Sequence, residues 1–156
     1  MKQPSAYGLL LTAFCLLLTA CSPKSTEPQP PNIAYGQDTC DACGMIISDA
    51  KFAAATLLTS GEALKFDDIG EMVTYHMDHP EQQVKAWFVH DYKSEAWIRG
   101  EAAFFVKSDQ LQTPMGGGVA AFEKKGDAEA FAAEKSGKVL TLDELRVEVH
   151  LKVHGN

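Results

Sequence analysis

An apolar run near the N-terminus ends at a cysteine and limits how much of the chain can fold. Residues 9–18 are apolar except for one threonine, Lys2 precedes them, and Thr19-Ala20 leads directly to Cys21. A basic start, a short apolar core and small residues before a cleavage point are typical of a secretory signal peptide. The run is shorter than the roughly 20 apolar residues that a membrane-spanning helix needs. We therefore predict that residues 1–20 are a signal peptide and that the chain folds after export.

The residues around the expected cleavage point carry a second signal. Leu18-Thr19-Ala20-Cys21 resembles the lipobox of bacterial lipoproteins, in which the cysteine is lipidated and becomes the new N-terminus. An ordinary signal peptide with a coincidental cysteine is the weaker alternative, because Cys21 occupies the place where cleavage belongs. Since Ser22 and not aspartate follows, bacterial sorting rules predict an outer-membrane anchor that faces the periplasm.

The next segment is rich in proline and poor in apolar residues. Residues 22–32 contain four prolines and no large apolar side chain, so we predict a lipidated, extended tether over residues 21–32. Residues 33–156 are long enough for one domain or for two small units that share a core, at about 33–98 and 99–156. The formal net charge of the whole chain is −7. No basic cluster accompanies it, which argues against a nucleic-acid partner.

Strand-like and helix-like segments alternate along the mature chain. Apolar or β-branched runs predict strands at 51–58, 63–66, 84–90, 103–107, 119–123 and 138–141, and helical spacing predicts helices from a cap at Asp67-Asp68 to about Met77 and over 127–136. Residues 142–145 can begin a last helical turn, although residues 147–153 alternate as a strand would. The order strand–strand–helix–strand occurs twice. We therefore predict an α+β fold of two small ββαβ-type units, with an internal duplication.

The reactive side chains concentrate in one short motif, Cys40-Asp41-Ala42-Cys43-Gly44-Met45. Cys40 and Cys43 are the cysteines that remain after the signal peptide and Cys21, and in an oxidising compartment they should form a disulfide or hold an ion. Gly44 permits a reversed backbone, and Met45 adds a thioether beside the two sulfurs. Thiolate together with thioether selects Cu(I) over harder metals.

A second sulfur donor, Met115, lies far along the chain between Pro114 and three glycines. Such a segment predicts a loop, where a packing role for methionine is least expected. The alternatives are a flexible hairpin with an incidental methionine here, and an ordinary core methionine at Met45. If the loop folds back over the cysteines, Cys43, Met45 and Met115 would form a three-coordinate Cu(I) site.

A zinc-binding module is one competing function. A structural zinc site needs four closed ligands, and the sequence has no second pair of cysteines. Cys40 and Cys43 could be completed by His76 and His79, and His150 with His154 is another candidate pair. A solvated surface position is the more frequent role for each of these histidine pairs.

A periplasmic thiol-disulfide oxidoreductase that uses Cys40 and Cys43 is the other competing function. That chemistry usually places the pair at a helix N-terminus, where the macrodipole lowers the thiol pKa. Here residues 44–48 follow, and they are apolar and strand-like. The pattern therefore favours metal binding over redox catalysis without excluding the latter.

Several short motifs occur in one order along the chain. They are Cys40-Asp41-Ala42-Cys43-Gly44-Met45, Lys65-Phe66-Asp67-Asp68 with Met72, Phe88-Val89-His90-Asp91-Tyr92, Trp97-Ile98, Met115-Gly116 and Ala121-Phe122. Each fragment is weak by itself, but the ordered set runs through most of the mature chain. The chain therefore resembles the NosL family, the accessory lipoproteins of nitrous oxide reductase.

The resemblance implies a copper chaperone, not an enzyme, that supplies Cu(I) to the copper-sulfur centre of nitrous oxide reductase. It also implies two ββαβ-type units related to part of organomercurial lyase. It places metal ligands at Cys43, Met45 and Met115, with Cys40 as a further ligand position and His90 as an assisting residue. The chain departs from the family pattern after Met115, because residues 116–118 are all glycine. Three glycines predict a more mobile loop that would weaken or retune the site.

Overall fold

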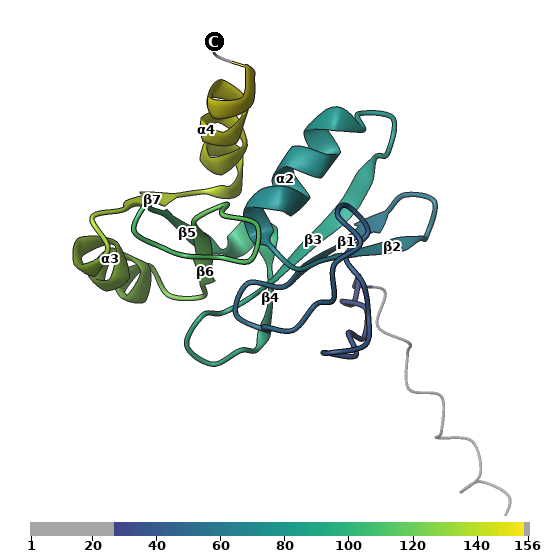
Figure 1. The fold of residues 1–156 in the computed structure, drawn as a ribbon, viewed down its shortest axis with the longest axis horizontal. Helices are drawn as coiled ribbons and strands as arrows, with labels where there is room; N and C mark the ends of the chain where they lie inside the picture. The colour runs from purple at the N-terminus through teal and green to yellow at the C-terminus, as the bar shows by residue number, and fades with distance from the viewer. Residues whose placement is uncertain (1–26, 155–156) are drawn as a thin grey trace, which may run out of the picture.

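The computed structural model describes residues 27–154, so the predicted signal peptide, Cys21 and the first part of the tether lie outside the described residues. Within the described residues the chain forms two small sheets and three α-helices, arranged as in Figure 1. The first part contains β1 (Ala54–Leu58), β2 (Ala63–Phe66), α2 (Ile69–Asp78), β3 (Val84–His90) and β4 (Trp97–Arg99). After the 3₁₀ turn η2 (Gly100–Ala102) follow β5 (Phe104–Lys107), β6 (Val119–Phe122), α3 (Lys125–Glu134), β7 (Lys138–Leu140) and α4 (Leu142–His154). The prediction of an α+β fold is confirmed.

The two parts repeat one topology. β1 pairs antiparallel with both β2 and β3, and β5 pairs antiparallel with both β6 and β7. In each part a helix connects the two outer strands, α2 from β2 to β3 and α3 from β6 to β7. Each part is therefore a split βαβ arrangement with its first strand in the middle. The predicted strand–strand–helix–strand order is present twice, and β4 is an additional strand beside β3 that the sequence analysis did not assign.

The two parts share one hydrophobic core. A single cluster of buried side chains includes Phe66 and Val89 from the first part and Phe105, Val119 and Leu145 from the second. The backbone also connects the sheets, because Asp91 forms a parallel bridge with Ala121, to whose carbonyl the Tyr92 N–H donates at 2.8 Å. The units therefore stabilise each other, and a change at their boundary is felt on both sides.

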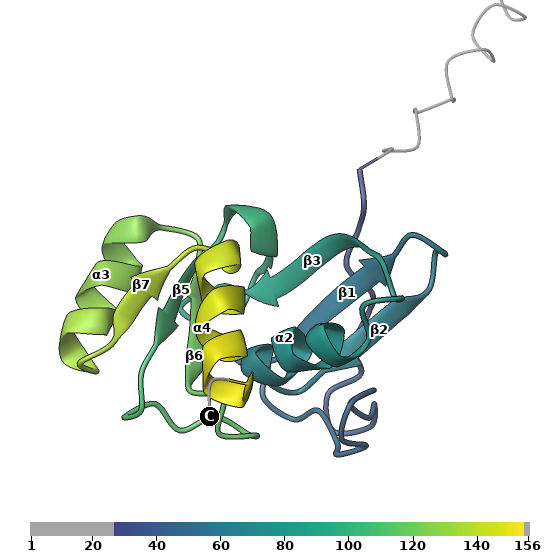
Figure 2. The same ribbon diagram turned by 90° about the horizontal axis from the view of Figure 1, so that it is seen from above.

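The helical turn allowed at 142–145 is the start of α4, and residues 147–153, whose alternation left a strand open, form most of this helix. Thr141 and Glu144 make a reciprocal capping box: the Glu144 N–H donates to the Thr141 hydroxyl at 3.3 Å, and the Thr141 N–H donates to the Glu144 carboxylate at 2.7 Å. Leu142, Leu145 and Val149 are buried at helical spacing. Figure 2 shows α4 over the junction, beside α2 and the second sheet. The Thr-x-x-Glu pattern of this capping box is present in the sequence at 141–144, beside the strand-like alternation of residues 147–153.

The end of the predicted tether that the structure describes has no helix or strand. Residues 27–30 border a shallow cavity with Phe88, Trp97 and Arg99 on the first sheet. No helix within residues 27–154 has both the length and the apolar character that crossing a bilayer requires.

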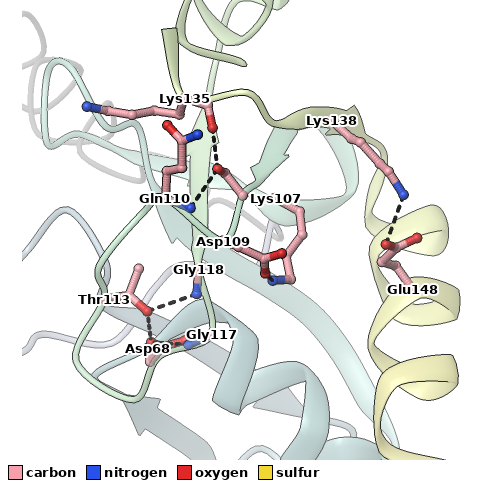
Figure 3. Close-up of polar contacts among 11 residues, drawn as sticks. Asp68, Lys107, Asp109, Gln110, Thr113, Gly117, Gly118, Lys135, Lys138 and Glu148 are labelled. Carbon is pink, nitrogen blue, oxygen red and sulfur yellow. Dashed lines mark hydrogen bonds and ion pairs between the residues drawn. The ribbon is translucent and has the colours of Figure 1, made fainter. Parts of the chain in front are cut away.

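Asp68 joins the start of α2 to the loop that precedes β6. Its Oδ1 accepts the Gly70 N–H at 2.7 Å and thereby caps the helix, and its Oδ2 accepts the Thr113 hydroxyl and the Met115 N–H, the latter at 3.1 Å. The side chain has no solvent exposure. Figure 3 shows Asp68 beside Thr113 and Gly117. This carboxylate fixes the loop against the helix, because a buried charge that lost these donors would be strongly unfavourable.

We predict that Asp68→Ala lowers the free energy of unfolding by about 2–4 kcal/mol, because it removes a helix cap and leaves buried N–H groups without an acceptor. Chemical denaturation monitored by circular dichroism measures the change. Asp109→Ala is the matched control, since the Asp109 side chain is exposed. Equal, small effects of the two substitutions would contradict the role assigned to Asp68.

Candidate metal centre

The segment from Cys40 to Met45 forms a closed turn. The Cys40 N–H donates to the Met45 carbonyl at 2.8 Å, and the Gly44 N–H donates back to the Cys40 carbonyl at 2.9 Å. Gly44 has a φ of 74°, a left-handed conformation in which a side chain would be strained. Thr39 and Ile46 form an antiparallel bridge just outside the turn. We call residues 40–45 the cysteine knuckle.

Hydrogen bonds to β2 fix the position of the cysteine knuckle. The Asp41 N–H donates to the Lys65 carbonyl at 2.8 Å, and the Lys65 N–H donates to the Asp41 carboxylate at 2.6 Å. The Lys65 ammonium adds an ion pair with Asp38 at 2.6 Å. Because α2 begins directly after β2, these bonds place the knuckle beside the first turn of that helix.

Two carboxylates from this region meet the two thiols. Cys40 Sγ donates to Glu71 Oε2 at 3.1 Å, and Cys43 Sγ lies 3.7 Å from Asp67 Oδ1. One ligand atom from each of these four residues lies within 4.8 Å of the others, an arrangement that can hold a metal ion. The sequence analysis did not identify Asp67 and Glu71 as site residues. Their spacing of four residues at a helix start was a signal, but only the pairing of the knuckle with β2 brings them to the cysteines.

Burial disfavours the thiolate form of both cysteines. Burial raises the pKa of Cys40, which is 2% exposed. Burial also raises the pKa of Cys43, which is partly exposed. Burial likewise raises the pKa of Glu71. The helix dipole does not reverse this trend, because the Asp68 carboxylate already caps the N-terminus of α2. A thiol-disulfide oxidoreductase uses a thiol of lowered pKa, and burial acts in the opposite direction on both cysteines.

Two exposed methionines flank this cluster. Met45 is 52% exposed on the knuckle, and Met115 is 42% exposed on the loop that Asp68 holds. Met115 and Glu71 line one cavity of about 380 Å³. The structure therefore brings the Met115 loop to the same end of α2 that carries the carboxylate partners of Cys40 and Cys43. Exposed methionines are unusual, since this side chain is normally buried as an apolar gap-filler.

The glycines after Met115 do not leave this loop loose. The Gly116 N–H donates to the Thr113 carbonyl and the Gly118 N–H to the Thr113 hydroxyl, both at 3.0 Å. A Cβ on Gly117 would lie only 2.3 Å from Asp68 Oδ1, so the absence of a side chain permits the close approach. Gly117 permits a tight fit against the start of α2, and the hydrogen bonds to Thr113 hold the loop where three glycines in succession had indicated mobility.

Comparison with known proteins agrees with this arrangement. The NosL family model matches residues 33–150. The chain belongs to the NosL family. It is 28% identical to the copper-binding lipoprotein NosL of Stutzerimonas stutzeri over 93% of this chain and 82% of that protein. It also matches the crystal structure of the copper chaperone NosL from Shewanella denitrificans, with a TM-score of 0.64 and 28% identity over 76% of this chain and 96% of the other.

These matches confirm the family resemblance drawn from the sequence motifs. The two relatives are named for copper binding and for a chaperone role, and neither name describes an enzyme. This agrees with the prediction of a non-enzymatic NosL protein. In both comparisons more than four-fifths of the relative is matched, so the similarity extends well beyond the cysteine knuckle.

His90 of this NosL-family chain lies apart from the four-residue cluster. It ends β3, is 3% exposed and stacks on Trp97 at 3.8 Å between ring centroids. Its Nδ1–H donates to the Glu95 carbonyl at 2.8 Å, so its Nε2 accepts the Tyr35 hydroxyl proton at 2.7 Å. Burial lowers the pKa of His90. Both ring nitrogens are occupied inside the protein, and His90 would have to lose Tyr35 before it assisted a metal.

The histidines weighed for a zinc site are not part of the four-residue cluster either. The Nε2 of His76 is hydrogen-bonded to the hydroxyl of the buried Thr56 at 2.9 Å. The His79 Nδ1–H donates to the Tyr75 carbonyl at 2.8 Å. His150 lies on α4, and the side chain of His154 lies outside the described residues.

We predict that alkylation distinguishes the two thiols of the reduced, metal-free protein. Cys43 should react with iodoacetamide about tenfold faster than the buried Cys40, and both should react more slowly than in denaturant. Mass spectrometry of the wild type, Cys40→Ser and Cys43→Ser assigns the rates. A thiol that reacted faster in the folded protein than in denaturant would restore the oxidoreductase alternative.

We predict that His76 contributes to acid sensitivity. Burial lowers its pKa to about 4, and the nearby His79 and Arg146 act in the same direction. Because the unfolded pKa is about 6.5, the stability from neutral His76 is fully present above that pH and is lost as the pH falls towards 4. The free energy of unfolding should therefore fall less steeply over this range in His76→Gln than in the wild type. Parallel curves would contradict the assignment.

Proposed function

We propose that this chain is a periplasm-facing lipoprotein that binds Cu(I) and delivers it to a copper enzyme. The Cys43 thiolate and the thioethers of Met45 and Met115 are the proposed ligands, with Cys40 as a further sulfur donor. His90 is proposed as an assisting residue, which requires that its hydrogen bond to Tyr35 breaks first. The named functions of the two NosL relatives support the metal, and the chemistry of the three side chains supports its oxidation state.

One observation carries the proposal: two exposed thioethers flank a partly exposed, reduced cysteine. Burying Met45 or Met115 would have stabilised the fold, so their exposure needs another reason. Soft sulfur donors on the surface provide one, because Cu(I) bound there is accessible to a docked partner. A site with few ligands can then pass its ion on by ligand exchange.

Asp67 and Glu71 are hard donors that suit Cu(I) poorly. In the proposed cycle they accept hydrogen bonds from the thiols while the site is empty. When Cu(I) binds, the thiol of Cys43 loses its proton, and the carboxylates remain beside the thiolate as outer groups that hold the knuckle in place.

The proposed client is nitrous oxide reductase, whose copper-sulfur centre would receive the ion. The family assignment supports this client, since the motifs that resemble accessory proteins of that enzyme include those that build the knuckle and the Met115 loop. The signal-like residues 1–20 and the lipobox at Cys21 support an outer-membrane lipid anchor, with residues 22–32 as the tether.

Zinc binding is the second candidate function, and the observed four-residue cluster favours it. Two sulfurs and two carboxylate oxygens within 4.8 Å form a set that a tetrahedral, borderline-soft ion can use. This alternative requires Asp67 and Glu71 and has no use for Met45 or Met115. The methionines therefore separate the two functions.

We predict that an anaerobic titration of the reduced, full-length protein against a competing chelator detects tight Cu(I) binding. Cys43→Ser, Met45→Leu and Met115→Leu should each weaken it by about tenfold or more, because each removes one soft ligand. Leucine keeps the volume of methionine while it removes the sulfur.

Met77→Leu is the matched control, because Met77 packs against the core and should leave Cu(I) affinity unchanged. Zn(II) is titrated in parallel. Indifference of Cu(I) binding to Met115→Leu, together with Zn(II) binding that depends on Asp67 and Glu71, would overturn the Cu(I) proposal in favour of the zinc site.

A further inference from the structure

The cavity beside Met115 is lined in part by two lysines, whereas the cluster of Asp67 and Glu71 is acidic. Met115 and Glu71 line this cavity of about 380 Å³ together with Lys107 of β5, Lys152 of α4 and Val149. Two lysines thus border the same cavity as a proposed copper ligand. The whole chain is acidic, with a formal net charge of −7, so this basic spot is a local exception.

Lys107 forms no ion pair with a buried carboxylate within the described residues, although the charges of Asp109, Glu148 and Asp68 act on it. Its side chain is 10% exposed, and its ion-pair partner within the described residues is Asp109, at 3.9 Å and 97% exposed. A lysine buried to this extent is normally paired, and an exposed carboxylate at the limit of contact contributes little. Figure 3 shows Lys107 and Asp109 together, apart from the Asp68 network.

The nearest buried carboxylate is already occupied. Asp68 accepts hydrogen bonds from the N–H groups of Gly70, Met115 and Gly117 and from the Thr113 hydroxyl. Lys152 adds a second positive charge, and burial followed by this charge lowers the pKa of Lys107. An anionic group that entered the cavity would therefore stabilise the charged forms of Lys107 and Lys152.

The shape of the site favours a carboxylate carried on a side chain over a free inorganic anion. The N–H of Gly117, which could otherwise bind phosphate or sulfate, already donates to Asp68. Val149 and Met115 offer apolar contact that suits the methylene stem of an acidic residue and not a hydrated ion. The cavity is also continuous with the exposed Met115, where a docked protein must reach the copper.

We propose that this cavity receives an acidic side chain of the protein that exchanges copper with this chain. Its carboxylate would lie between Lys107 and Lys152, and a sulfur donor next to it in the partner would then reach Met115. The inference rests on the proposed Cu(I) carrier function, because it assigns the docking point beside that site. The two lysines would let this chain, which is acidic as a whole, bind an acidic segment of the partner at one defined place.

Short labelled peptides test the docking point without copper. An acetylated, amidated Met-Ser-Glu peptide and its Met-Ser-Gln counterpart are titrated into metal-free, full-length protein at low ionic strength, and fluorescence anisotropy gives the dissociation constants. We expect the Glu peptide to bind the wild type about five- to tenfold more tightly than the Gln peptide. The preference should diminish as salt is added.

Matched variants locate the effect. Lys107→Met and Lys152→Met should each abolish the preference for Glu, and Lys125→Met, on the exposed surface of α3, should keep it. Lys152→Met covers the case in which the buried Lys107 position does not tolerate substitution. Equal binding of the two peptides, or a preference that persists in both Lys107→Met and Lys152→Met, would overturn the proposal. Complete displacement of the Glu peptide by an equal concentration of inorganic phosphate would also overturn it, in favour of a free-anion site.

The result is separable from the carrier function. Absence of Cu(I) binding in the chelator titration would overturn the proposed function, while the peptide comparison on metal-free protein would still report on the lysines. Tight Cu(I) binding with no preference for Glu would overturn the docking point alone.

Discussion

The structure depends on the hydrogen bonds of one buried carboxylate. Asp68 caps α2 with one oxygen and holds the Met115 loop with the other, so the loop cannot shift along the helix start without taking hydrogen-bond donors from a buried carboxylate. The same contact sets the distance between the helix start, where Asp67 and Glu71 meet the cysteines, and the loop that presents Met115. Fold stability and site geometry therefore share a single interaction.

Much of the fold could be predicted from the sequence, because the hydrophobic periods of β1, β3 and α2 agree with their turn and cap signals. The extent of the last helix could not, because residues 147–153 alternate as a strand would and only the turn at 142–145 read as helical. Burial of Leu145 and Val149 decided the outcome, and such tertiary packing is invisible in a local pattern.

The sulfur ligands of the candidate site could be predicted from the sequence, because their cysteines and methionines lie in unusual sequence contexts. Cys43, Met45 and Met115 each stand beside glycine, and Cys40 is paired with Cys43 three residues on. Asp67 and Glu71 were not visible, because their approach to the thiols depends on the pairing of Asp41 with Lys65 across 24 residues. The role of residues 116–118 was also hidden, since a glycine that permits close packing and a glycine that permits mobility look the same in a sequence.

The central claim is that copper is held by sulfur from both the cysteine knuckle and the Met115 loop, with the carboxylates outside the first ligand shell. Copper K-edge X-ray absorption of the Cu(I)-loaded protein tests it most directly. The account predicts a first shell of three sulfurs, or four where Cys40 also binds, that loses one sulfur in Met115→Leu and is unchanged in Met77→Leu. A first shell dominated by oxygen or nitrogen, or a spectrum that Met115→Leu leaves unaltered, would contradict it.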